Sequence, residues 1–337
     1  MRATFVWGIL LSSALVYRPA TIAAADTPAS DALPQREKIH FQASWDGTSQ
    51  AAYVAAPSPA ANATAESKDV LRPLVVSLHS WSGNLEQRQP ELERLVAERQ
   101  WFCLQPDFRG ANDDPLACAS EAAQQDILDA VDWMLANHPI DTERIYLTGS
   151  SGGGHMTMMM AARYPKRWTA ASAWVGISDL AAWHKLHAEG RYGQMMRQCC
   201  GGAPGDSPEV DEQYRLRSPL TFLQHAVGIP LDIAAGIHDG HSGSVPVRHS
   251  LIAFNKIAAA VQGEQVSESE MQQLAVDDGR LQTPRAGDEG QDPSFQRAYY
   301  LRRNAGVARV TIFEGGHEGI ATAAMAWFDA HLTRSAE

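Results

Sequence analysis

The feature that most constrains this chain is a five-residue G-x-S-x-G sequence at 149–153, between an apolar run and a helix-forming stretch. The run 144–148 predicts a strand, and the stretch 156–163 predicts a helix. This order predicts a sharp strand–turn–helix that presents Ser151 at the carboxyl end of a strand and the amino end of a helix. Flanking glycines suit such a turn, because they adopt unusual backbone angles and leave steric room. Ser151 is therefore the candidate nucleophile.

Size and charge narrow the class of protein. The chain has 337 residues, of which 45% are hydrophobic and 20% charged, an ordinary balance for one large globular α/β domain. Its formal net charge of -11 argues against nucleic acid or an anionic membrane as a partner. We therefore expect a small-molecule partner. Oligomeric state is left open by the sequence.

The first 25 residues resemble an export signal. Arg2 supplies the positive start, the apolar run 5–16 is too short to span a bilayer, and Ala23-Ala24-Ala25 offers a small-residue cleavage site. Cleavage after Ala20 and an uncut N-terminal anchor are the alternatives. Residues 26–37 are expected to be a flexible lead-in. The mature protein is therefore expected to be secreted or periplasmic, where its four cysteines could form disulfides of undetermined pairing.

The rest of the chain alternates strand and helix patterns. Eight apolar runs predict strands, at 39–43, 51–55, 74–78, 101–105, 144–148, 170–175, 230–235 and 307–313. Helical periods predict helices at 92–99, 119–137, 156–163, 247–261 and 319–332. Such alternation favours a mostly parallel, doubly wound eight-stranded sheet with helices on both faces. Two segments, 182–228 and 262–304, interrupt it as insertions.

A serine nucleophile needs a base, and the base needs an orienting acid. Asp239 lies on a glycine-flanked turn after the seventh predicted strand, and His317 lies on a similar turn after the eighth. Both turns open at the sheet edge that carries Ser151, in the chain order Ser, Asp, His. Asp179, after the sixth strand, is the alternative acid. The sequence leaves open whether Arg109 contacts the substrate or forms a structural ion pair.

Two backbone N–H groups are candidates for an oxyanion hole, which stabilises the charge that develops when the serine attacks a carbonyl group. One belongs to Gly152, directly after the candidate nucleophile. The other is expected from the loop 79–83 after the third strand, where Trp81 is the first choice and Ser80 the second. The dipole of the helix that starts at Gly152 adds positive potential at the same place.

The chain resembles the prolyl-oligopeptidase-like and acyl-esterase branch of the α/β-hydrolases. The resemblance covers about residues 70–332 and rests on 78–83, 149–153, Arg217-Ser218-Pro219, His238-Asp239-Gly240, Val245-Pro246 and 316–319. It implies an α/β-hydrolase catalytic domain at 38–337 in which Ser151 is the nucleophile, His317 the base and Asp239 the acid. Ser80 stands where many members have glycine, and the sequence contains no propeller-like gating domain.

The resemblance and the three candidate residues together predict a secreted serine hydrolase that needs neither cofactor nor metal. A carboxylic ester is the expected substrate, because nothing in the sequence implies a gate that restricts entry to short peptides. A serine peptidase like prolyl oligopeptidase is the alternative. A non-catalytic relative used for binding is a third reading, which retention of all three residues disfavours.

Export predicts a shortened mature chain. Residues 5–25 should be missing from the protein purified from the culture fluid or periplasm, because signal peptidase removes the segment during transport. Intact mass and N-terminal sequencing measure this directly. A mature protein that begins at Met1 would contradict the prediction.

Overall fold

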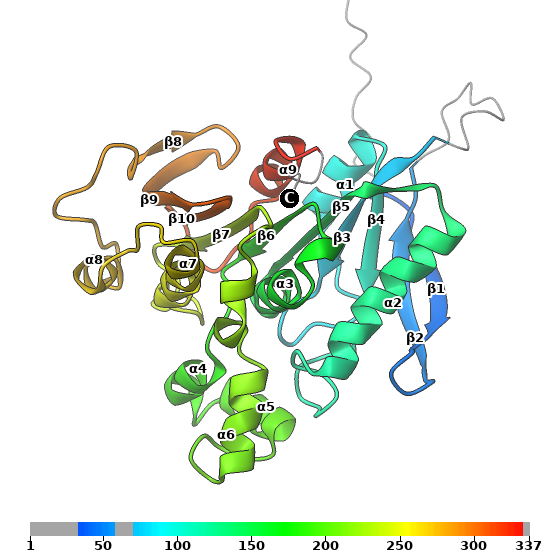
Figure 1. Cartoon of the computed structure of the whole chain (residues 1–337), viewed down its shortest axis with the longest axis horizontal. Coiled ribbons are helices and arrows are strands. Elements are labelled where there is room, and N and C mark those ends of the chain that lie inside the picture. The colour runs from blue at the N-terminus through cyan, green and yellow to red at the C-terminus, as the bar shows by residue number, and fades with distance from the viewer. Residues whose placement is uncertain (1–32, 58–69, 333–337) are drawn as a thin grey trace, which may run out of the picture. The chain divides into compact units, whose positions relative to one another are not determined.

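A ten-stranded sheet organises the part of the chain that the computed structural model describes, residues 33–57 and 70–332 (Figure 1). The strands lie across the sheet in the order β1-β2-β4-β3-β5-β6-β7-β10-β9-β8. Their bounds are β1 Glu37–Gln42, β2 Ser49–Ala55, β3 Arg72–Leu78, β4 Phe102–Pro106, β5 Ile140–Ser150, β6 Ala170–Trp174, β7 Leu231–Gly236, β8 Gly290–Asp292, β9 Arg297–Ala305 and β10 Ala308–Phe313. The expected signal peptide, 1–25, lies outside the described residues.

The central strands are parallel, as the alternation of strands and helices predicted. β4, β3, β5, β6, β7 and β10 pair in parallel, and antiparallel strands close both edges. One edge is the hairpin β1–β2, which joins β4. The other is β9 and β8, which extend the sheet beyond β10. The doubly wound α/β class is therefore confirmed.

The expected number of eight strands is wrong, because β8 and all but the last residue of β9 lie within the segment 262–304 that the sequence assigned to an insertion. The arginines of β9 obscured its strand pattern. Leu301 and Arg303 both point to the buried side, and the Arg303 guanidinium is neutralised there by Asp288 at 2.9 Å and Glu270 at 2.6 Å. A buried charge needs such partners, and they come from residues that precede the strand.

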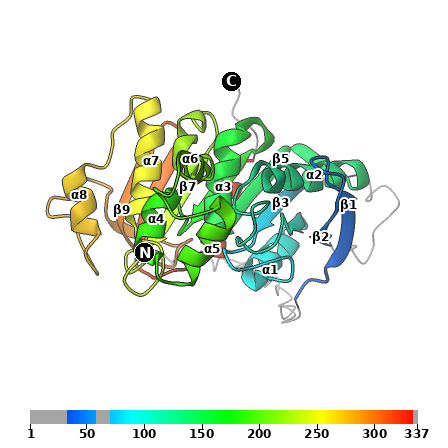
Figure 2. The same cartoon turned by 90° about the horizontal axis from the view of Figure 1, so that it is seen from below.

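Helices cover both faces of the sheet. Their bounds are α1 Pro90–Glu98, α2 Glu121–Asn137, α3 Gly152–Arg163, α4 Leu180–His187, α5 Arg191–Cys200, α6 Pro208–Leu216, α7 Arg248–Ala260, α8 Glu268–Leu274 and α9 Ala321–Asp329. Figure 2 shows α1 on the opposite side of the sheet from α2, α3 and α7. Among helices built from residues 33–57 and 70–332, none has the length and apolar character that crossing a bilayer requires.

The central strands are mostly apolar because both of their faces are covered. In β3, Leu74 and Val76 belong to the core under α2 and α3, whereas Val75 packs with Leu92 of α1 and Phe328 of α9. This alternation follows from the two-residue period of a strand.

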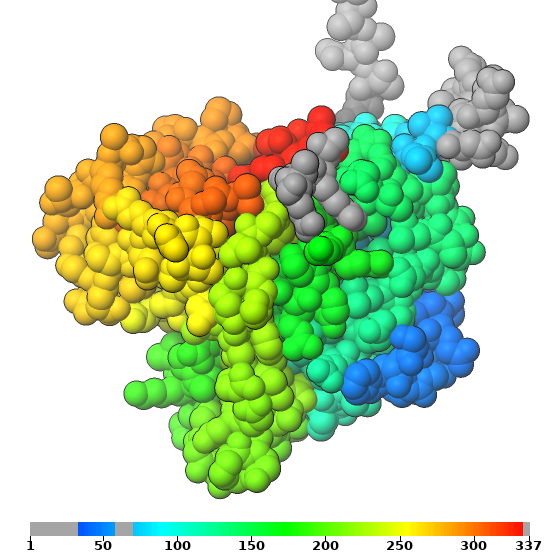
Figure 3. Space-filling model, in the orientation of Figure 1, coloured from blue at the N-terminus to red at the C-terminus, as the bar shows by residue number. Residues whose placement is uncertain are grey.

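The first insertion is helical and has an apolar cluster of its own. It contains α4, α5 and α6, which lie below the sheet in Figure 1 and form a projection in the space-filling view of Figure 3. The cluster includes Trp183, Met196 and Tyr214, together with Trp81 from the loop after β3. α5 ends at Cys200 because Gly201 adopts a left-handed φ of 84°. All four cysteines are buried and unpaired.

Candidate active site

Ser151 occupies a strained turn between β5 and α3, residues 149–153, which we call the elbow. Its φ is 61° and its ψ is -118°, in a region that residues other than glycine rarely adopt. The neighbouring glycines permit this turn through close packing. A Cβ at Gly149 would lie 2.6 Å from the backbone of Gly153, and one at Gly153 would lie 2.3 Å from the carbonyl oxygen of Leu78. The turn therefore needs hydrogen in place of a side chain at both positions.

Three predicted side chains meet in one hydrogen-bonded row. Ser151 Oγ lies 2.9 Å from His317 Nε2, and His317 Nδ1 lies 2.8 Å from Asp239 Oδ2. Asp239 follows β7 and His317 follows β10, so each side chain projects from the carboxyl end of a parallel strand. The row has the geometry that proton transfer from a serine hydroxyl to an imidazole requires.

Backbone N–H groups fix the buried Asp239 carboxylate. Its Oδ1 accepts hydrogen bonds from Gly240 N at 2.9 Å and Val245 N at 3.1 Å, which leaves Oδ2 for His317. The alternative acid, Asp179, has another role, because its side chain accepts from Ala182 N at 3.0 Å and caps α4. The structure thus brings Asp239, and not Asp179, to the histidine.

The backbone nitrogens of Trp81 and Gly152 lie beside Ser151. A Cβ built at Gly152 would lie only 2.3 Å from Trp81 N, so the two segments are in close contact. Neither N–H group donates to an acceptor among the described residues. The loop is held elsewhere, since Asn112 N donates to Trp81 O at 2.9 Å and Ser80 Oγ donates to Gln87 Oε1 at 2.8 Å. Both N–H groups remain available to a ligand oxygen.

Other titratable groups near the elbow are structural. Burial lowers the pKa of His155 and of His249 to about 4, so both rings are neutral at pH 7. His79 binds the carbonyl oxygens of Ser80 and Asp107 at 2.9 and 2.8 Å. Arg109, which the sequence left open, pairs with Asp126 at 2.6 Å and Asp46 at 2.7 Å.

A cavity of about 460 Å³ opens in front of Ser151 and His317. Sequence reasoning missed much of its wall, which comes from the start of α1 and from α9, here Gln89, Pro90, Glu91, Leu92, Ala321 and Ala324. The one signal for the α1 wall was Pro90, which favours the first turn of a helix. Tyr192 of the first insertion also lines the cavity. Trp183 and Met195 of the same insertion are not among the described residues that line the cavity. The Trp183 ring packs instead against the Trp81 ring, with 4.7 Å between the two ring centroids.

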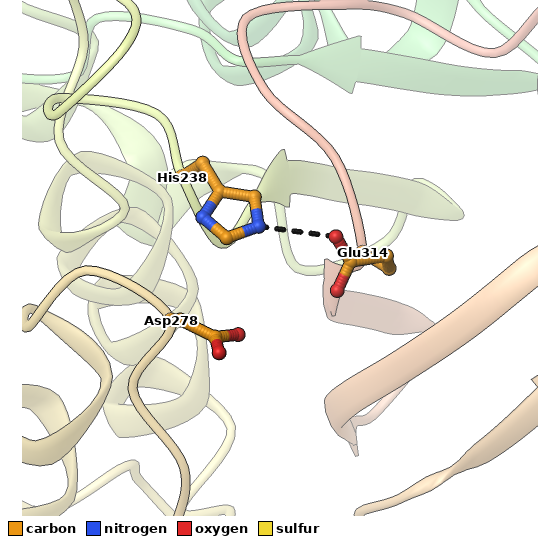
Figure 4. A group of neighbouring side chains, drawn as sticks. All are labelled: His238, Asp278 and Glu314. Carbon is orange, nitrogen blue, oxygen red and sulfur yellow. Dashed lines mark hydrogen bonds and ion pairs between the residues drawn. The ribbon is translucent and has the colours of Figure 1, made fainter.

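A group of potential cation ligands lies beside the Asp239 turn. Donor atoms of His238, Asp278 and Glu314 lie within 4.8 Å of one another, and Figure 4 shows the His238 ring facing Glu314. The guanidinium of Arg280 already pairs with carboxylates of this group. Arg280 pairs with Asp278 at 2.6 Å and lies 3.7 Å from Glu314. The side chains therefore form an ion-pair network of their own, and we assign no metal to them.

Comparison with known proteins agrees with this fold. The model of the prolyl oligopeptidase family matches residues 117–275. The described fold is similar to the acylaminoacyl peptidase of Pyrococcus horikoshii, with a TM-score of 0.59 and 17% identity over 90% of this chain and 43% of that one. The chain is an α/β-hydrolase. The family match and the relatives below show similarity to the branch that contains prolyl oligopeptidases and acyl esterases.

Curated relatives of this α/β-hydrolase match over shorter stretches. A probable acetylxylan esterase A of Neosartorya fischeri is 34% identical over 73 residues, which are 19% of this chain and 20% of the esterase. The uncharacterized peptidase YtmA of Bacillus subtilis is 27% identical over 125 residues, which are 37% of this chain and 45% of that protein. The chain thus spans less than half the length of each of these relatives.

The hydrogen-bonded row predicts different results for the two aspartates. Asp239→Asn should slow the reaction of Ser151 with a fluorophosphonate probe by about ten-thousandfold, because an amide favours the wrong imidazole tautomer. Asp179→Asn should leave that rate within a few-fold of the parent, since asparagine is also a good N-cap. The measurement is the rate of covalent labelling followed by mass spectrometry. Exchange of the two outcomes would place the acid after β6.

Proposed function

We propose that this α/β-hydrolase is a serine hydrolase that works through an acyl-enzyme. Ser151 is the nucleophile, His317 the general base and Asp239 the acid that orients it. The observation that carries the proposal is the row Ser151–His317–Asp239, with contacts of 2.9 and 2.8 Å. The strained backbone of Ser151 supports it, since such strain is concentrated at functional sites.

The proposed reaction uses only groups of the chain and water. His317 Nε2 accepts the proton of Ser151 as its Oγ attacks the carbonyl carbon, and Asp239 stabilises the imidazolium. The N–H groups of Trp81 and Gly152 donate to the oxyanion. His317 then returns the proton to the leaving group as the ester or amide bond breaks. In the second half it deprotonates a water molecule, which releases the acid and frees Ser151.

A carboxylic ester with a neutral acyl group is the proposed substrate. Relatives named as acetylxylan esterases favour an ester, and favour an acyl group carried by a carbohydrate. The cavity supports a neutral group, since its described lining includes Glu91 and Glu318 but no lysine or arginine to bind an anion. A peptide is the second candidate, favoured by the match to the prolyl oligopeptidase family.

Export is part of the proposal. The positive start at Arg2, the short apolar run and the alanine-rich site before Asp26 support a secreted or periplasmic enzyme. A carbohydrate ester is a substrate that such an enzyme would meet outside the cytoplasm.

Loss of the nucleophile should abolish turnover. Ser151→Ala is expected to lower kcat for nitrophenyl acetate by on the order of a millionfold, because the acyl-enzyme cannot form. Ser150→Ala, the neighbouring hydroxyl, is the matched control and should be far milder. Circular dichroism checks that both variants fold. Activity of Ser151→Ala within tenfold of the parent would reject the assignment.

A substrate panel separates ester from peptide. We expect measurable kcat/KM for nitrophenyl acyl esters and for an acetylated xylose, and none for prolyl or aminoacyl anilides under the same conditions. The Ser151→Ala protein measures the background with each compound. Turnover of the anilides at rates that match the esters would replace the proposed esterase with a peptidase.

A further inference from the structure

His238 precedes Asp239 directly, and its ring lies between two carboxylates. Nδ1 is 2.9 Å from Asp277 Oδ1, and Nε2 is 3.0 Å from Glu314 Oε1. Figure 4 shows the second contact, in which the ring of His238 faces Glu314 across the turn. None of the proposed catalytic steps uses this side chain.

Both contacts require a proton on each ring nitrogen. A carboxylate only accepts hydrogen bonds, and a neutral imidazole has one N–H donor, so it can satisfy only one of the two. The hydrogen bond to Asp277 makes the largest contribution, and the hydrogen bond to Glu314 the next, to a rise in the pKa of His238 above its usual value. The same contact lowers the pKa of Asp277, so the shifts of the two partners agree.

Other charged groups around the ring are already paired. Asp278 binds Arg280 at 2.6 Å, and Arg280 stacks 3.3 Å from the centroid of the Tyr300 ring. Tyr300 donates to Glu314 Oε2 at 2.5 Å. His241, the remaining titratable group on the same turn, lies with Nε2 3.0 Å from the carbonyl oxygen of Ala275. The charge on His238 is thus the one that joins Asp277 to Glu314.

The three bridged segments include both turns of the candidate triad. His238 belongs to the turn that carries Asp239. Glu314 lies three residues before His317, and His238 N donates to Gly315 O at 3.0 Å between the same two turns. Asp277 belongs to the segment that follows α8, inside the second insertion. The imidazole ring of His238 therefore connects three segments. They are the turn that carries Asp239 (the acid turn), the turn that carries His317 (the base turn) and the second insertion.

We propose that protonated His238 is a positioning residue, which holds the Asp239 turn against the His317 turn and against the segment after α8. The inference rests on the proposed serine hydrolase function. Because the pKa of His238 is raised, the bridge is complete below that pKa and loses one of its two donors as the pH rises through it. The rate should then fall on the alkaline side.

The test compares two neighbouring, exposed aspartates. Asp277→Asn removes the largest stabilisation of the His238 charge, so the alkaline fall in kcat should move to lower pH by about 0.2–0.7 unit, the range that an exposed ion pair supplies. Asp278→Asn is the matched control, since Asp278 pairs with Arg280. In this variant kcat should fall at the same alkaline pH as in the parent protein. The measurement is the pH profile of kcat for nitrophenyl acetate, with the His238 ring followed by NMR.

A double-mutant cycle makes the link specific. His238→Gln should lower kcat at neutral pH with little change in KM, and Asp277→Asn should then cause no further shift. His238→Arg, which keeps a charge and several donors, should restore part of the loss. Identical pH profiles for Asp277→Asn and Asp278→Asn would overturn the inference. Failure of the parent protein to react with fluorophosphonate would instead overturn the proposed function, so the two failures are distinguishable.

Discussion

The close contact between the elbow and the strand beside it is the constraint on which the site depends. Ser151 can hold its φ of 61° only because α3 begins directly against the end of β3. That contact leaves no space for a Cβ at Gly153, which would meet Leu78 O at 2.3 Å. The same contact brings Trp81 N to Gly152. One packing requirement thus places both the Ser151 hydroxyl and the pair of N–H groups at the cavity.

The register of the parallel strands brings the remaining groups to the hydroxyl. Ser150 pairs with Trp174 of β6, Trp174 with Ala234 of β7, and Phe313 of β10 with Gly236. These strands therefore end at the same edge, and the turns that follow them carry Ser151, Asp239 and His317. A glycine is needed at 236, where a Cβ would lie 2.3 Å from Gly316 O, because the acid and base turns cross there.

The sequence predicted the parts of the molecule that short-range patterns specify. Glycine-flanked turns after apolar runs identified Ser151, Asp239 and His317, and local turn geometry determines where these residues lie. β9 was missed because burial of Arg303 depends on Asp288 and Glu270, which no periodicity links to it. The α1 wall of the cavity was missed for a related reason. Its distance from Ser151 depends on how α1 and α9 pack together, a tertiary contact between segments more than 200 residues apart.

The first insertion supports two of the loops that form the site. The buried ring of Trp183, in α4, packs against the ring of Trp81, and the two ring centroids lie 4.7 Å apart. Its Nε1 donates to the carbonyl oxygen of Ser244 at 2.8 Å, and His187 Nε2 lies 2.8 Å from the same oxygen. Ser244 directly precedes Val245, whose N–H binds Asp239 Oδ1.

One helix, α4, therefore contacts the loop that carries Trp81, one of the two proposed oxyanion donors, and the loop that fixes Asp239. The two loops follow different strands and have no short connection in the chain, so an element packed against both is needed to keep them in register. On the other side of the acid turn, His238 makes the corresponding connection to the base turn. Asp239 is thus held from two directions, by the hydrogen bonds of α4 to Ser244 on one side and by the ion pair of His238 on the other. The ion pair is lost when the His238 ring loses its proton, so protonation can change this part of the support.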